Sequence, residues 1–306
     1  MPQPNNDELL AFVLEIDSLL IQKGALPHQR PMHAMLEASK RFGTTIITDT
    51  DPTSLCGRIN SIYHQLYRAS DLYMPPIYTG AFMFRDIFYP VRIPVFYGTV
   101  ILDPVSFLQD MERDQKDWLF ASKESGLTYL DQAIDIFDFA CGLDELEHHE
   151  SLSSSMEMWR LGRRQLEVAA AAALVSFDKH AIVQNCLIAC ELIFKGALLT
   201  CGYEKAELKT KYGHNFKKLG TEIANSLPRV DGDRIVSVAS TLPDLVANRY
   251  ENENYRRIDI GRIVMTSQFI GGEIIRQFAS SNMRSELTSA ADDWDTSKRT
   301  FPSLTV

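Results

Sequence analysis

The sequence has little of what marks several common protein classes. Only 5 of its 306 residues are cysteines, and their spacings form no paired framework, so neither a disulfide scaffold nor a cysteine-ligated zinc site is expected. No Gly-x-x-x-x-Gly-Lys-Ser/Thr, Gly-x-Ser-x-Gly or His-Glu-x-x-His string occurs, so phosphate-loop, serine-hydrolase and zinc-protease mechanisms have no support. Basic residues number 31 against 40 acidic ones, which argues against a protein that binds nucleic acid over its whole surface.

Signals for a membrane or for export are also lacking. The first eight residues are polar and acidic, where a signal peptide has a basic start and an apolar stretch. The most apolar region, residues 168–199, is interrupted by seven charged or polar side chains, too many for a bilayer span. We therefore expect a cytoplasmic protein without a membrane partner, a metal or another cofactor.

The charge that is present is distributed unevenly. Residues 1–150 hold 11 basic and 22 acidic side chains, whereas residues 151–306 hold 20 and 18. The string at 144–155 is polar, serine-rich and without periodicity, which is typical of a linker. The sequence thus predicts four parts: an acidic α+β region at 1–143, a linker at 144–155, a helical bundle at 156–285 and a flexible tail at 286–306.

Hydrophobic periodicity predicts a mainly α protein. Apolar residues recur every three or four positions over most of the chain, as in helices that each bury one face. The segment 74–104 differs, because aromatic and β-branched residues are concentrated there, and it predicts a small β element. The expected fold is therefore a mixed N-terminal region followed by a helical region.

One predicted helix, residues 178–201, carries its polar residues on a single strip. At 100° per residue, His180, Gln184, Glu191 and Lys195 fall within about 60° of one another. Glu191 and Lys195 are also spaced i,i+4 in the favourable order for an ion pair. Either this strip is the solvent edge of a bundle helix, or it faces a groove that binds a ligand.

Residues 156–285 resemble the HEPN family of helical bundles, which handle nucleotides and RNA. The resemblance is carried by the helix Ala181–Leu199 with Glu191 and Lys195, by Gly213-His-Asn-Phe-Lys-Lys-Leu219, and by Leu242-Pro-Asp-Leu-Val-Ala-Asn-Arg-Tyr250. It implies a C-terminal up-and-down helical bundle, nucleotide or RNA binding and a homodimer formed through helix faces. Catalytic members of the family carry an Arg-x(4–6)-His motif on a late helix, but no histidine follows His214 in this sequence.

The function expected from these patterns is therefore binding without catalysis. The ligand would be a nucleotide, RNA or a protein partner. The expected ligand-binding residues are Glu191, Lys195, His214, Lys217, Arg249 and Tyr250. The alternative is a metal-independent ribonuclease-like toxin or defence effector in which His214 acts with Arg249 or Arg256, because a histidine can move protons while an arginine stabilises phosphate charge.

Two clusters of basic and aromatic residues support a phosphate-bearing ligand. The first surrounds Tyr203, Tyr212 and six basic side chains between residues 205 and 218, and the second spans residues 249–257. Such mixtures suit phosphates and stacked bases. Acidic residues lie among them, however, so a mixed solvated surface explains the same pattern.

Overall fold

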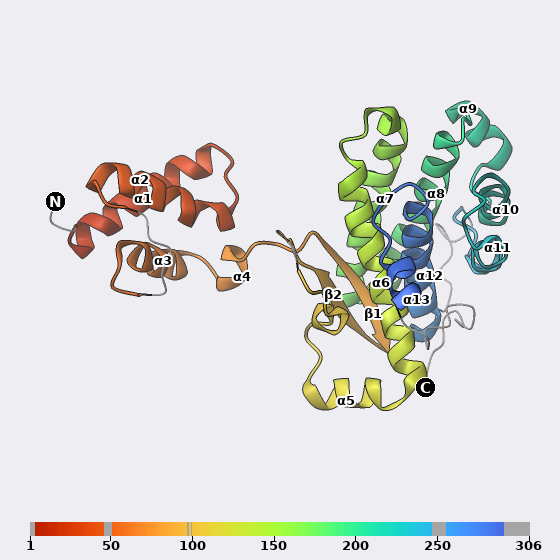
Figure 1. Cartoon of the computed structure of the whole chain (residues 1–306), viewed down its shortest axis with the longest axis horizontal. Helices are drawn as coiled ribbons and strands as arrows, with labels where there is room; N and C mark the ends of the chain where they lie inside the picture. The colour runs from red at the N-terminus through yellow and green to blue at the C-terminus, as the bar shows by residue number, and fades with distance from the viewer. Residues whose placement is uncertain (1–3, 46–50, 97, 99, 247–254, 291–306) are drawn as a thin grey trace. The chain divides into compact units, whose positions relative to one another are not determined.

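The computed structural model describes residues 4–45, 51–96, 98, 100–246 and 255–290, and the chain is mainly helical over these residues. It divides into two compact units, Met1–Pro75 and Pro76–Val306 (Figure 1). This division differs from the boundary expected at residues 144–155. Those residues lie inside the second unit, where they connect two of its long helices.

The first unit is a small helical unit. Its helices are α1 (Asn6–Gln22), α2 (Arg30–Phe42), α3 (Leu55–Leu66) and the single turn α4 (Ala69–Leu72). The Asn5 side chain accepts a hydrogen bond from the backbone N–H of Glu8 and so caps the N-terminus of α1. The apolar faces of the three longer helices enclose a core that includes Leu9, Phe12 and Tyr63.

The small β element is confirmed, but it belongs to the second unit. Strands β1 (Tyr78–Phe84) and β2 (Ile87–Ile93) form an antiparallel hairpin in which Phe82 lies opposite Tyr89. The described residues of the first unit contain no strand. The expected mixed α+β region at 1–143 is therefore split between the two units.

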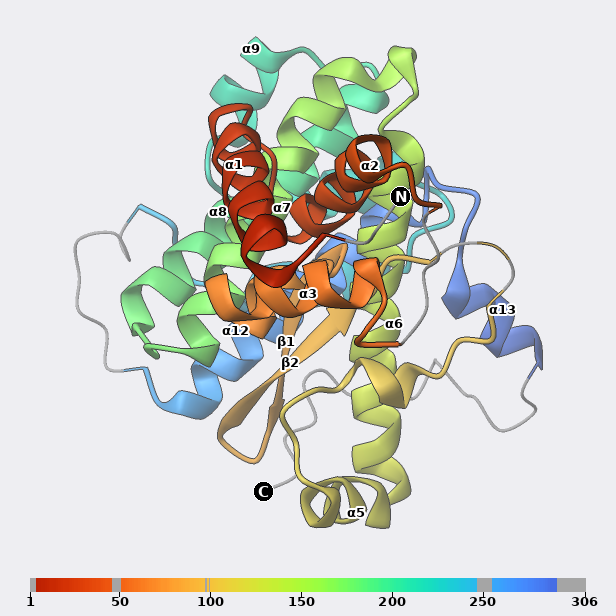
Figure 2. The same cartoon turned by 90° about the vertical axis from the view of Figure 1, so that its left-hand side faces the viewer.

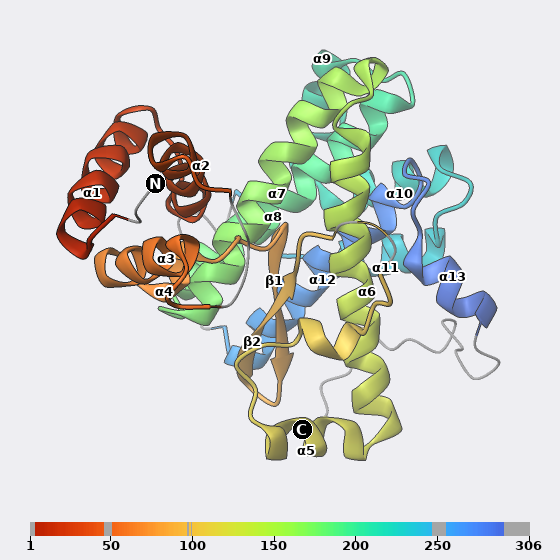
Figure 3. The same cartoon turned by 60° about the vertical axis from the view of Figure 1, so that its left-hand side comes forward.

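Long helices make up the body of the second unit (Figures 1, 2 and 3). In chain order its helices are α5 (Arg113–Ala121), α6 (Lys123–Leu146), α7 (Ser153–Leu174), α8 (Lys179–Thr200), α9 (Lys205–Glu207), α10 (Phe216–Ser226), α11 (Gly232–Thr241), α12 (Arg257–Ile275) and α13 (Met283–Ala290). Helix α12 packs against both α6 and α8, α8 packs against α7, and α10 packs against α8 and α11. The hairpin packs against α6, α7 and α12.

A close approach of α7 and α8 depends on glycine. A Cβ atom added at Gly196 of α8 would lie 2.5 Å from Nε1 of Trp159 on α7. The same Nε1 donates a hydrogen bond of 3.2 Å to the carbonyl oxygen of Ile193. The Trp159 side chain is fully buried, so the absence of a side chain at Gly196 lets the two helices pack around the indole.

The connection between α6 and α7 is tied to the rest of the second unit where α6 ends. The Glu145 carboxylate accepts hydrogen bonds from the backbone N–H groups and hydroxyls of Ser280 and Ser281. Glu147 forms an ion pair with Arg160 of α7 at 2.9 Å. Polar composition alone cannot distinguish such a connection from a linker. In the expected tail, residues 286–290 form part of α13, and residues 291–306 lie outside the described part of the chain.

Candidate functional site

The polar strip of α8 is only partly at the surface. Gln184 is buried, whereas His180 is exposed. The side chains of Glu191 and Lys195 are 13% and 12% exposed. Because α7, α10 and α12 all pack against α8, most of the strip is covered by neighbouring helices rather than by solvent. The solvent-edge interpretation therefore holds for only part of the strip.

Glu191 is the centre of a three-residue charge cluster. The Nζ atom of Lys195 lies 2.5 Å from one carboxylate oxygen, and Nδ1 of His214 lies 2.7 Å from the other. The structure thus brings together three of the residues expected at the site, and we call Glu191, Lys195 and His214 the α8 cluster. His214 is 49% exposed, so the cluster reaches the surface through its imidazole.

Local backbone geometry places His214 over α8. A π-helical turn at Leu208–Tyr212 ends at Gly213, whose φ of 53° and ψ of −120° reverse the chain direction. Asn215 then begins α10 by accepting a hydrogen bond of 2.9 Å from the backbone N–H of Lys218. His214 is held between these two features, and π-helical turns often accompany functional sites.

The contact with Glu191 sets what the imidazole can do. When Nδ1–H donates to the carboxylate, Nε2 carries the lone pair and is the ring atom available to a ligand. Protonation of Nε2 turns the ring into a cation beside an anion that already contacts Lys195. The α8 cluster can therefore accept a proton or bind an anionic group through His214.

Lysines around the α8 cluster supply positive charge. Lys217, an expected ligand residue, is exposed in the first turn of α10, and Lys218 follows it. Among the described residues, no acidic side chain forms an ion pair with Lys209, Lys217 or Lys218. The other two lysines of this region are paired, Lys205 with Glu157 at 3.0 Å and Lys211 with Glu207 at 3.5 Å.

The two tyrosines of this region pack against each other. Tyr212 is 5% exposed, and its ring packs edge-on against Tyr203 with centroids 6.2 Å apart. The Tyr203 hydroxyl donates a hydrogen bond to Glu222, which raises the pKa of Tyr203 above its ordinary value. Tyr212 is therefore covered by the protein, whereas Tyr203 is half-buried and its hydroxyl is engaged by Glu222.

The structure does not bring Arg256 to His214. Both carboxylate oxygens of Asp259 accept hydrogen bonds from the Arg256 guanidinium, at 2.8 and 2.9 Å. Arg256 lies near the first turn of α8, because Lys179 of that turn donates a hydrogen bond to the carbonyl oxygen of Tyr255, the residue before Arg256. Glu191, the partner of His214, is about 18 Å further along that helix. Arg249 and Tyr250, the other expected site residues in this segment, lie outside the described residues.

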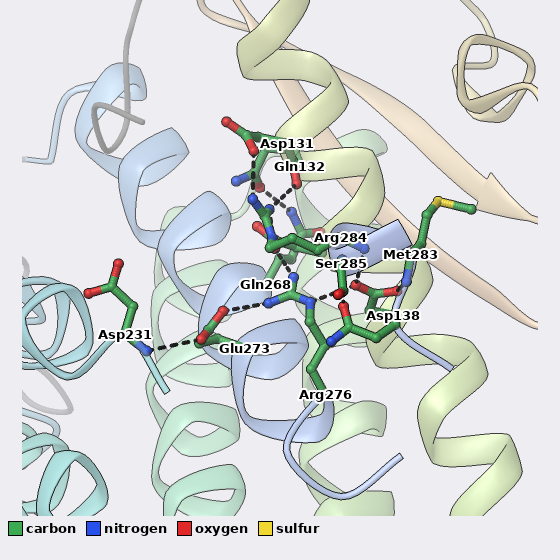
Figure 4. A network of polar contacts seen from close by, with 12 residues as sticks. Asp131, Gln132, Asp138, Asp231, Gln268, Glu273, Arg276, Met283, Arg284 and Ser285 are labelled. Carbon is green, nitrogen blue, oxygen red and sulfur yellow. Dashed lines mark hydrogen bonds and ion pairs between the residues drawn. The ribbon is translucent and has the colours of Figure 1, made fainter. Parts of the chain in front are cut away.

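A second group of charged residues, not expected from the sequence, lies in the core of the second unit (Figure 4). The Arg276 guanidinium is 3% exposed and contacts Asp135, Asp138 and Glu273. Arg284 of α13 joins the network through Asp131 and Asp135 at 2.9 Å each. In Figure 4, α6 supplies Asp131 and Asp138, α12 supplies Glu273 and Arg276, and the two arginines point between these carboxylates.

Two pKa shifts follow from this arrangement. Burial acts against the charge on Arg276, but the three carboxylates around it outweigh burial and raise its pKa above the ordinary value. Burial raises the pKa of Asp138 in spite of its contact with Arg276. The network joins α6, α12 and α13, and the side chains of Arg276, Asp135 and Asp138 are no more than 3% exposed, so these charges are closed off from solvent and hold the three helices together. The sequence signal that predicts this network is the spacing of Asp131, Asp135 and Asp138 along one face of an otherwise apolar helix.

Among the described residues, no group of three or more His, Cys, Asp or Glu side chains could hold a metal ion. One described helix, α8, is long and apolar enough to cross a membrane by length and composition, and 72% of its apolar window is buried within the protein. Neither a protein-family model, nor a curated protein, nor a solved structure matches this chain.

Proposed function

We propose that this protein binds a phosphate-bearing ligand, a nucleotide or RNA, without cleaving it, and that residues 156–285 form a HEPN-like bundle. The observation that carries the proposal is the group of cationic side chains around the α8 cluster. Lys209, Lys217 and Lys218 have no acidic partner among the described residues, and His214 adds a ring nitrogen beside them. Lysine side chains that are not neutralised by acids are the usual contacts of nucleic-acid phosphates.

The same surface favours the phosphates of a ligand over its bases. Tyr212 is buried and Tyr203 is bonded to Glu222, so the described aromatic rings of this region do not form a stacking platform. Contacts to phosphate alone position a nucleic acid but do not distinguish its sequence. We therefore propose that the protein binds nucleic acid with little sequence preference. We propose further that it is cytoplasmic and, by its resemblance to the HEPN family, forms a homodimer through helix faces.

Binding of a fluorescent 20-nucleotide RNA, measured by anisotropy at several salt concentrations, tests the proposal. The double variant Lys217→Gln/Lys218→Gln should bind the RNA several-fold more weakly. It should also lower the slope of log K against log salt by about 1.4, since each phosphate contact to single-stranded nucleic acid contributes about 0.7. The matched control is Lys116→Gln/Lys123→Gln, which removes the same charge from α5 and α6.

A competition with free ATP in the same assay distinguishes a nucleotide from RNA as the preferred ligand. Displacement of the RNA by micromolar ATP assigns the site to nucleotides. If neither ligand binds, or if both double variants weaken binding equally, the proposal fails. A protein partner is then the remaining expected ligand.

The contact between His214 and Glu191 favours a second candidate function, the ribonuclease-like toxin or defence effector. A carboxylate that orients an imidazole through Nδ1 is a common arrangement for a general base. Arg256, however, is bound to Asp259, so this reaction would need another cation to stabilise phosphate charge. Cleavage of total RNA in the presence of a chelator, lost in His214→Ala, would establish this candidate over the non-catalytic one.

A further inference from the structure

A pocket of about 410 Å³ lies between α11 and α12, away from the α8 cluster. Its lining consists of Ser237, Val238, Thr241, Leu242, Pro243, Tyr255, Asp259, Arg262, Ile263 and Thr266. Neither His214 nor any lysine of the proposed phosphate surface contributes to it. The volume falls in the range of about 300–1,000 Å³ typical of sites for small molecules.

Positive side chains outnumber negative ones at the pocket. Asp259 is the one acidic residue in the lining, and both of its oxygens are occupied by the Arg256 guanidinium. Arg262, which also lines the pocket, has Nη1 3.7 Å from Asp259, a distance too long for a hydrogen bond. One carboxylate thus faces two guanidiniums, and Arg262 supplies the excess positive charge.

The remaining lining residues are of two kinds. Val238, Leu242, Pro243 and Ile263 provide apolar walls. Ser237, Thr241, Tyr255 and Thr266 provide hydroxyl groups. An apolar enclosure with a few polar groups and one charged group is the usual composition of a site that orients a small ligand.

We propose that this pocket binds a small organic anion, with its oxyacid head on Arg262 and its apolar body against Val238, Leu242 and Ile263. A carboxylate and a phosphate monoester both supply such a head, because guanidinium groups bind the oxygens of either one in pairs. A cationic ligand is disfavoured, since Asp259 already carries two hydrogen bonds from Arg256.

Saturation-transfer NMR on the full chain tests the proposal with three probes that share one ring: benzoate, phenyl phosphate and benzyl alcohol. We expect at least one of the two anions to bind about tenfold or more tightly than the neutral alcohol, because only the anions can form charge-assisted hydrogen bonds with Arg262. The anion with the higher affinity identifies the head group, carboxylate or phosphate.

Three variants make the test specific. Arg262→Gln should abolish the preference for the anions, whereas Arg160→Gln should retain it, because Arg160 is equally exposed (47% against 49%) but lies on α7. Ser237→Tyr should block all three probes by placing a ring in the pocket from an exposed position. Absence of binding to the wild type, equal binding of alcohol and anions, or an anion preference that survives Arg262→Gln would each overturn the proposal.

Discussion

The Nδ1 atom of His214 lies 2.7 Å from a carboxylate oxygen of Glu191, and the other oxygen of Glu191 lies 2.5 Å from Nζ of Lys195. One acidic side chain therefore contacts two basic ones that come from different segments. This contact fixes the turn before α10 onto α8, so it links the stability of the second unit to the position of its exposed histidine.

Replacing Glu191 should destabilise the second unit more than replacing a similar exposed residue. Glu191→Gln leaves Lys195, which is 12% exposed, beside a neutral amide. We expect a loss of about 1–2 kcal/mol in the free energy of unfolding, measured with urea. In the control Glu207→Gln, the i,i+4 partner Lys211 is 57% exposed, and the loss should stay below about 0.5 kcal/mol. Equal losses in the two variants would show that the α8 cluster adds no stability.

Adding one methyl group at Gly196 should destabilise the contact between α7 and α8. The new Cβ would lie 2.5 Å from Nε1 of Trp159, so the indole or the helix must move. We expect Gly196→Ala to cost about 1–3 kcal/mol. Gly162→Ala is the comparison, because its Cβ would meet the Ile193 side chain at 3.1 Å and a small shift relieves the contact. A larger loss in Gly162→Ala than in Gly196→Ala would contradict the observed packing.

Removal of Arg276 should be among the most damaging single substitutions in the second unit. Arg276→Ala leaves Asp135, Asp138 and Glu273 without their shared cation in a buried site. The expected cost is about 3–5 kcal/mol, since breaking a buried ion pair leaves uncompensated charge.

The matched control for this variant is Arg256→Ala, which removes a guanidinium that donates two hydrogen bonds to Asp259. The Arg256 side chain is 73% exposed, so we expect its loss to cost no more than about 1 kcal/mol. Thermal unfolding of both variants, followed by circular dichroism, measures the difference. Similar midpoints for the two would exclude a stabilising role for the buried network.

Glu145 should make stability depend on pH in the acidic range. Burial acts to raise the pKa of Glu145, but hydrogen bonds from Ser280 and Ser281 outweigh it and lower the pKa to about 2 from an ordinary 4.5. The folded state therefore binds this proton less readily than the unfolded state. The stabilisation is fully present above pH 4.5 and is lost as the pH falls towards 2.

Urea unfolding of Glu145→Gln at several pH values tests this dependence. The variant should be less stable than the wild type at pH 6, and the difference should shrink as the pH is lowered from 4.5 towards 2. Glu150→Gln, at an exposed position in the connection that follows α6, should follow the wild type throughout. A difference between Glu145→Gln and the wild type that stays constant with pH would contradict the role assigned to the Ser280 and Ser281 contacts.

Much of the secondary structure could be predicted from the sequence, because it depends on local patterns. The period of apolar residues predicted the helix that became α8, and the aromatic and β-branched residues of 74–104 predicted the hairpin. The boundary between units could not be predicted in the same way. The polar string 144–155 and the real division near Pro75 are both short connections, and only the contacts made across them tell the two apart.

The sequence by itself determined which residues form helices and which side chains share a helix face, since both follow from periodicity along the chain. Only the tertiary structure decided which neighbour covers each face. It joined His214 to Glu191, buried Gln184 and Tyr212, and separated Arg256 from the histidine expected beside it. It also brought Arg276 to Asp138, 138 residues earlier in the chain. The physical reason is that periodicity orients a side chain relative to its own helix, whereas its partner depends on packing among all the helices.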